Sequence, residues 1–129
     1  MKRKLFIIIN LLFILCFTGC TYGSEFTVGS VESNTLTSMS MEYLKFSGNK
    51  NTKIKLEEAE TCEIYVNIVS EDGKLDLFIT DENGEHSYEG HNIPTSEFTV
   101  TLSKAGQYKI RVEAKDHKGS YKINWDIKK

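Results

Sequence analysis

Apolar and polar residues alternate with a period of two along most of the chain after Met41. Strict alternation is typical of β-strands that bury one face and expose the other. Turn signals such as "SGNKN", "EDGK", "DENGE", "KAGQ" and "DHKG" separate the alternating segments, and no long amphipathic helix is apparent. About seven or eight such strands predict an all-β fold, a single antiparallel β-sandwich of jelly-roll-like form.

Two of the turn signals suggest a strand register. Asp72-Gly73 is a favoured two-residue hairpin turn, and it would place Ile68 opposite Leu77 on the core face. A second hairpin would pair Ala114 with Tyr121, which brings opposite charges together on the exposed face. The sequence therefore predicts two local hairpins, one over residues 62–80 and one over residues 108–127.

The N-terminal segment resembles an export signal. Three basic residues precede the apolar run Leu5–Phe17, which is shorter than the roughly 20 residues that a membrane-spanning helix needs. The run ends in "FTGC", Phe17–Cys20, which resembles the lipobox of bacterial lipoproteins, although leucine is usual where Phe17 stands. The resemblance implies cleavage before Cys20 and attachment of diacylglycerol to its sulfur. The alternative is an ordinary secretory signal.

This interpretation divides the chain into three parts. Residues 1–19 are predicted to be the lipoprotein signal peptide, residues 20–40 a lipid-anchored flexible tether, and residues 41–129 the β-sandwich domain. Part of the tether, residues 26–31, could dock as an edge strand. The expected location is the cell membrane, lipid-anchored on its extracytoplasmic side, with inner and outer membrane both left open.

The charge of the processed chain argues against nucleic acid as a partner. Residues 1–19 contain three of the 16 basic residues and none of the 18 acidic ones, so their removal leaves a net charge of −5. A nucleic-acid-binding surface would need a basic stripe. Cys62 would be the one thiol left beside the anchored Cys20, and its position among the apolar residues of a strand predicts a buried, unreactive side chain.

Three short motifs combine glycine with aromatic or aliphatic residues: Gly73, Leu75, Asp76, Leu77 and Phe78 in the first, Ala105, Gly106 and Tyr108 in the second, and Gly119 and Tyr121 in the third. These motifs resemble those of the bacterial pre-peptidase C-terminal domain, a small β-sandwich found on secreted proteases. The match covers roughly residues 62–127. It implies a non-catalytic accessory or binding domain, of a family in which some members bind collagen-type substrates or calcium.

The candidate ligand-binding residues are Tyr65, Asn67, Asp76 and Phe78, on the outer face of the predicted hairpin 62–80. Exposed aromatic rings beside amide and carboxylate groups can stack on a sugar or hold a peptide. The alternative is that the N-terminal segment packs over them.

Two loops contain residue types that can bind metals. Residues 84–91 contain His86, Glu89 and His91 together with Glu85, but their spacing fits no known zinc motif. Residues 81–84, "DENG", lack the alternating oxygen ligands of a familiar calcium loop and predict a turn. We therefore expect neither a metal nor another cofactor.

No catalytic motif is present: the sequence has no nucleophile elbow, no phosphate-binding glycine loop and no His-Glu pair at helical spacing. The predicted function is a cell-envelope lipoprotein whose non-catalytic β-sandwich binds a carbohydrate or protein ligand at the outer face of the membrane. Two alternatives stay open, a protective or inhibitory lipoprotein that binds a secreted protein and a structural accessory of an envelope complex.

Overall fold

The computed structural model describes residues 26–129, which form one antiparallel sheet of seven strands. The strands are β1 Phe26–Val28, β2 Val31–Thr35, β3 Ser38–Leu56, β4 Thr61–Asp81, β5 His86–Gly90, β6 Ser96–Leu102 and β7 Gly106–Lys128. The predicted all-β antiparallel architecture is confirmed. Within the described range no helix is long and apolar enough to cross a membrane, and the predicted signal peptide and Cys20 lie outside that range.

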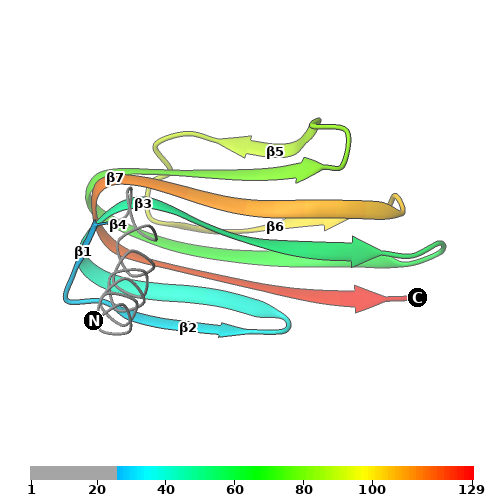
Figure 1. Ribbon diagram of the computed structural model, residues 1–129, viewed down its shortest axis with the longest axis horizontal. Helices are drawn as coiled ribbons and strands as arrows, with labels where there is room; N and C mark the ends of the chain where they lie inside the picture. The colour runs from blue at the N-terminus through cyan, green and yellow to red at the C-terminus, as the bar shows by residue number, and fades with distance from the viewer. Residues whose placement is uncertain (1–25) are drawn as a thin grey trace, which may run out of the picture.

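The sheet forms a sandwich because its three long strands bend near their middles. Figure 1 shows β3, β4 and β7 running out in one layer, turning together at one end of the molecule and returning in a second layer. The first layer contains β2, β6, the first halves of β3 and β4, and the second half of β7. The second layer contains β5 and the remaining halves of the long strands. We call the shared bend the corner.

The corner is made by three irregular segments, one in each long strand. The register shifts between Tyr43 and Gly48 in β3 and between Ser70 and Lys74 in β4. Gly73 and Gly119 have φ angles of 75° and 142°, and a Cβ atom at either position would collide with a carbonyl oxygen of the neighbouring strand. Glycine is required there because only a residue without a side chain allows both the backbone angle and the close approach.

The two predicted hairpins are wrong. Ile68 pairs with Tyr121 and Leu77 pairs with Val112, since β4 and β7 lie side by side over almost their whole lengths. "EDGK" and "DHKG", taken as hairpin turns, are the corner segments of β4 and β7. Both arrangements keep the same alternation of buried and exposed residues, so the sequence pattern does not distinguish a strand that bends from a strand that turns back.

The inward side chains of both layers form one core. Its most buried members, each 0% exposed, are Phe46, Cys62, Ile64, Leu77, Ile79, Ile110 and Ile123. Burial raises the pKa of the Cys62 thiol to about 11, which keeps it protonated, as expected of a buried structural cysteine. The predicted turn at residues 81–84 is also confirmed, because the Asp81 carboxylate accepts hydrogen bonds from the backbone N–H groups of Asn83 and Glu85, both 2.9 Å.

A chain of hydrogen bonds runs through the buried corner. Ser70 donates to the Ile93 carbonyl (2.7 Å), so its oxygen is free to accept from His117 Nε2 (2.8 Å). His117 Nδ1 then accepts from the Tyr43 hydroxyl (2.6 Å). Every donor has an acceptor when the imidazole is neutral. His117 is 0% exposed, and burial lowers its pKa. His117 belongs to "DHKG", which the sequence pattern predicts to be a turn between strands.

The N-terminal strands shorten the segment that separates the domain from Cys20. Residues 26–40, the second part of the predicted tether, form β1, β2 and the start of β3. β1 pairs with β3 beside the corner, where Val28 lies opposite Lys45. Residues 21–25 are therefore all that lie between Cys20 and the first described strand.

Candidate functional site

The four predicted site residues lie on two different surfaces. Tyr65 and Asn67 belong to the first half of β4 and point away from the core on the outer face of the first layer. Asp76 and Phe78 follow the corner and lie on the outer face of the second layer. Because both layers direct their inner faces at one core, the two outer faces point in opposite directions. Asn67 pairs with Lys122 and not with Phe78, as the hairpin would have required.

The outer face of the first layer presents rows of polar side chains across neighbouring strands. One row contains Thr99, Tyr65, Asn124 and Ser38, and the next contains Glu97, Asn67, Lys122 and Ser40. The rows combine hydroxyl, amide, ammonium and carboxylate groups with one exposed aromatic ring. Such a surface can hydrogen-bond to a polar ligand at several points at once.

A groove runs along this face toward the corner. A first depression of about 380 Å³ is lined by Tyr65, Asn67, Lys122 and Asn124, among others. A second, of about 410 Å³, adjoins it and shares Asn67 and Lys122. A third, of about 330 Å³, shares Glu42, Val69 and Ser120 with the second and reaches the corner. Each has a volume near the low end of the range for ligand sites and is wide open to solvent. Together they form a shallow, elongated groove, which we call the first-layer groove.

Intramolecular hydrogen bonds hold the two predicted residues of this groove in place. The Tyr65 hydroxyl donates to the Glu63 carboxylate (2.5 Å), and Asn67 Nδ2 donates to Glu97 Oε1 (3.1 Å). The bond to Glu63 is also the main cause that raises the pKa of Tyr65, so the phenol stays protonated. Tyr65 is 41% exposed, and its bond to a residue two positions earlier directs the ring along the strand. The hydrogen bond thus restrains the Tyr65 ring, and part of the ring remains exposed to solvent.

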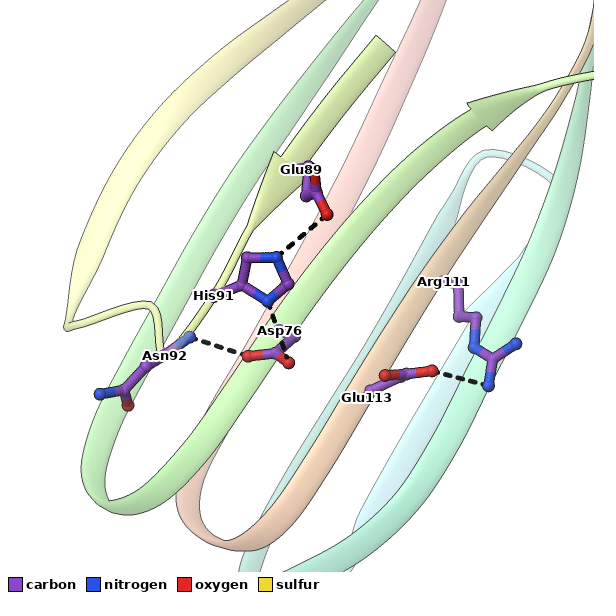
Figure 2. Close-up of polar contacts among 6 residues, drawn as sticks. All are labelled: Asp76, Glu89, His91, Asn92, Arg111 and Glu113. Carbon is purple, nitrogen blue, oxygen red and sulfur yellow. Dashed lines mark hydrogen bonds and ion pairs between the residues drawn. The ribbon is translucent and has the colours of Figure 1, made fainter. Parts of the chain in front are cut away.

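The outer face of the second layer carries an ionic cluster around His91, drawn in Figure 2. The imidazole lies between Glu89 Oε1, 3.1 Å from Nε2, and Asp76 Oδ2, 3.4 Å from Nδ1. The other Asp76 oxygen accepts from the Asn92 backbone N–H (2.8 Å). Hydrogen bonds to Glu89 and then to Asp76 raise the pKa of His91.

Phe78 is enclosed on this face by its neighbours. The ring centroids of His86 and His91 lie 5.5 and 5.4 Å from that of Phe78. Arg111 lies opposite Phe78 on β7, and its Nη2 donates to Glu113 Oε1 at 2.7 Å. The charged groups around Phe78 are thus mostly bonded to one another, whereas Arg111 Nε is buried without a hydrogen-bond partner in the described part of the chain. Within residues 26–129 no three His, Cys, Asp or Glu side chains come together as a metal site.

Four polar residues that line the first depression are absent from the predicted site: Glu97, Thr99, Lys122 and Asn124. Each stands at an outward position of an alternating strand, which is a detectable signal. What could not be deduced is that β6 and β7 flank the first half of β4, because the predicted hairpins paired β4 and β7 with themselves.

No family model matches the chain, and no curated protein matches it. Among solved structures it is similar to a family 35 carbohydrate-binding module from Clostridium thermocellum, with 13% identity, a TM-score of 0.44 and coverage of 77% of this chain and 90% of that one. It is also similar to the pre-peptidase C-terminal domain of a collagenase from Bacillus anthracis (14%, 0.46, 78% and 90%). A third is PliG, a periplasmic lysozyme inhibitor from Aeromonas hydrophila (12%, 0.43, 77% and 86%). At these identities no site residue is carried over to this chain.

Proposed function

We propose that this protein is a lipid-anchored component of the cell envelope whose sandwich binds an extended oligosaccharide, without catalysing a reaction, in the first-layer groove. The observation that carries the proposal is the continuity of the groove. Three adjoining depressions share lining residues from Tyr65 to the corner. An elongated hollow on a rigid sheet fits a chain-like ligand better than a small compact one.

The lining favours a sugar chain over an apolar ligand. Thr99, Asn124 and Ser120 offer neutral hydroxyl and amide groups that can exchange hydrogen bonds with sugar hydroxyls. Tyr65 supplies a fixed, partly exposed aromatic surface on which the apolar face of a sugar ring can stack. Because these side chains project from paired strands and the Tyr65 hydroxyl is bonded to Glu63, little ordering is needed on binding.

Membrane attachment is supported by the sequence alone. A basic start, a short apolar run and the lipobox-like Phe17–Cys20 support export, cleavage before Cys20 and acylation of its sulfur. One acyl chain gives only marginal membrane binding, whereas the two chains of a diacylglycerol hold a protein stably. The intact mass of protein extracted from membranes tests this directly. We expect a chain that starts at Cys20 with added acyl mass, and release of a Cys20→Ser variant from the membrane.

Binding is tested by screening the protein against an array of envelope and extracellular glycans, followed by calorimetry with any oligosaccharide that binds. Tyr65→Ala should weaken binding about tenfold or more through loss of stacking. The matched control is Lys109→Ala, an exposed residue on the outer face of the second layer, which should leave the affinity unchanged. Equal loss in both variants, or binding to no glycan, would contradict the groove as a sugar site. Groove-dependent capture of a secreted protein would instead favour an inhibitory role.

A further inference from the structure

The described chain begins at the corner of the sandwich. β1 lies at that end of the molecule, while β7 ends at the opposite end, as Figure 1 shows. Six residue steps separate Cys20 from Phe26, which an extended chain covers in about 20 Å at most. A lipid on Cys20 would therefore hold the corner, rather than any other part of the domain, close to the bilayer.

Apolar side chains are exposed at this end. Val28, Val31 and Leu44 are 41%, 70% and 61% exposed. Leu44 lies against Gly29, where an added Cβ would be 3.0 Å from its Cδ1, so the loop between β1 and β2 and the bulge of β3 form one surface. Neighbouring apolar groups left in solvent indicate a surface that another apolar phase covers.

Lysines lie at the same end of the molecule, in the bent segments of all three long strands. Lys74 and Lys115 lie directly opposite each other in the β4–β7 register, an arrangement that is destabilising unless an anion lies nearby. Within residues 26–129 neither has a carboxylate partner. Lys45 and Lys118 have only long, exposed ion pairs, 3.5 Å to Asp116 and 3.8 Å to Glu71.

The bent segments of the corner contain more lysines than carboxylates. These three segments, residues 44–48, 70–74 and 115–119, contain four lysines against Glu71, Asp72 and Asp116, a net charge of +1. The described residues as a whole contain 13 basic and 17 acidic residues, a net charge of −4. Basic and apolar side chains at one end of a domain suit the boundary between lipid phosphates and acyl chains.

We propose that the corner of the sandwich rests on the lipid surface, with Val28, Val31 and Leu44 at the acyl boundary and Lys74 and Lys115 on headgroup phosphates. This inference rests on the proposed anchor at Cys20. Leu44 lines the third depression of the first-layer groove and Val31 lines the second, so the lipid surface covers the corner end of the groove. The end at Tyr65 is the part that stays open to the extracellular ligand. Contact with the membrane fixes the orientation of the domain, which a long flexible tether would not do.

The test uses the lipidated full-length protein in vesicles of phosphatidylcholine and phosphatidylglycerol that carry brominated acyl chains, which quench tryptophan on contact. The native protein has one tryptophan, Trp125, which is buried in the second half of β7 beyond the corner. We expect strong additional quenching for Leu44→Trp. A Glu58→Trp variant, in the turn between β3 and β4 at the opposite end, should show none.

The lysines have a matched control within the chain. Lys53 and Lys109 form a second directly opposed pair, on the outer face of the second layer away from the corner. In the Leu44→Trp background, Lys74→Glu with Lys115→Glu should reduce the quenching several-fold, whereas Lys53→Glu with Lys109→Glu should leave it unchanged.

The outcomes separate the two proposals. Protein that floats with the vesicles but shows equal quenching at positions 44 and 58 would overturn the resting corner and leave the anchor intact. Protein that does not float with the vesicles would overturn the anchor and, with it, the resting corner.

Discussion

Two regions of this molecule contain a histidine held by two polar partners, and they differ in the burial of the imidazole and in the charge of its partners. At the corner, His117 is 0% exposed and lies between a phenol and a serine hydroxyl. On the outer face of the second layer, the His91 side chain is 60% exposed and lies between two carboxylates. The comparison shows that neutral partners and burial favour the uncharged imidazole, while carboxylates favour the charged one.

The regions also differ in what they do for the fold. The corner joins the two layers, and its polar chain links β3, β4 and β7 with the Ile93 carbonyl. The His91 cluster lies on the solvent-exposed outer face of the second layer and links the end of β5 to its neighbour β4. We therefore expect large effects of substitution at the corner and small ones at the cluster.

Gly119→Ala should give the largest effect. A Cβ atom there would collide with the Val69 carbonyl oxygen, and the φ angle of 142° is unfavourable for alanine. We expect a loss of stability of about 3 kcal/mol or more, measured by urea unfolding. The control is Gly84→Ala, which also has a positive φ, 84°, but no atom within 4 Å of the added Cβ. Similar losses in the two variants would mean that the corner is no more constrained than a surface turn.

Tyr43→Phe tests the buried hydrogen-bond chain with little change in shape. It removes the donor to His117 Nδ1 and leaves a buried acceptor without a partner. We expect a loss of about 1–3 kcal/mol. Tyr65→Phe also removes a tyrosine hydrogen bond, but from a 41% exposed ring on the outer face of the first layer. The unfolding midpoint of that variant should not move. A stable Tyr43→Phe variant would show that water or a rotated side chain satisfies His117.

The sequence predicted the layers of this fold better than their connections. Alternation at residues such as Ile64, Val66 and Ile110 assigned the buried faces correctly, because a bend in a strand does not change which side chains point inward. The hairpin prediction failed because Gly73 permits a turn and a bulge equally well. The pairing of β4 with β7 decides between a turn and a bulge. This pairing joins residues that are far apart in sequence, so no local sequence pattern indicates it.

The same error limited the prediction of the site. Tyr65 and Asn67 were recognised as outward residues, and they line the first-layer groove. Asp76 and Phe78 were grouped with them only through the incorrect hairpin. Lys122 and Asn124 complete the groove from β7, which is adjacent in space and distant in sequence. Composition and alternation thus indicate which residues face solvent, whereas the register decides which of them face the same ligand.

The pH dependence of stability should separate the two histidines. Burial lowers the pKa of His117, so at mildly acidic pH the unfolded chain binds a proton that the folded chain does not. The contribution of His117 to folding stability is complete above about pH 6.5, the ordinary pKa of histidine. That contribution is lost as the pH falls toward the lower pKa that His117 has in the folded protein. We expect stability, measured by urea unfolding, to decrease as the pH falls below about 6.5. NMR titration of the imidazole resonances should give His117 a lower pKa than His91, and the reverse order would contradict the proposed roles.

His91→Gln should have the smallest effect and the opposite dependence on pH. Because hydrogen bonds to Glu89 and Asp76 raise the pKa of His91, its contribution is present below about pH 6.5 and is lost as the pH rises through the folded pKa. The side chain is exposed, so solvent screens the pairs and the unfolding midpoint should change little at neutral pH.

The informative measurement is the slope of stability against pH just above 6.5. The native protein should lose a little stability there as His91 gives up its proton, and His91→Gln should remove that loss while leaving the decrease at acidic pH, which belongs to His117. If the substitution instead removed the acidic decrease, the exposed histidine would be the one that controls stability. The assignment of opposite electrostatic roles to the corner and the surface cluster would then be wrong.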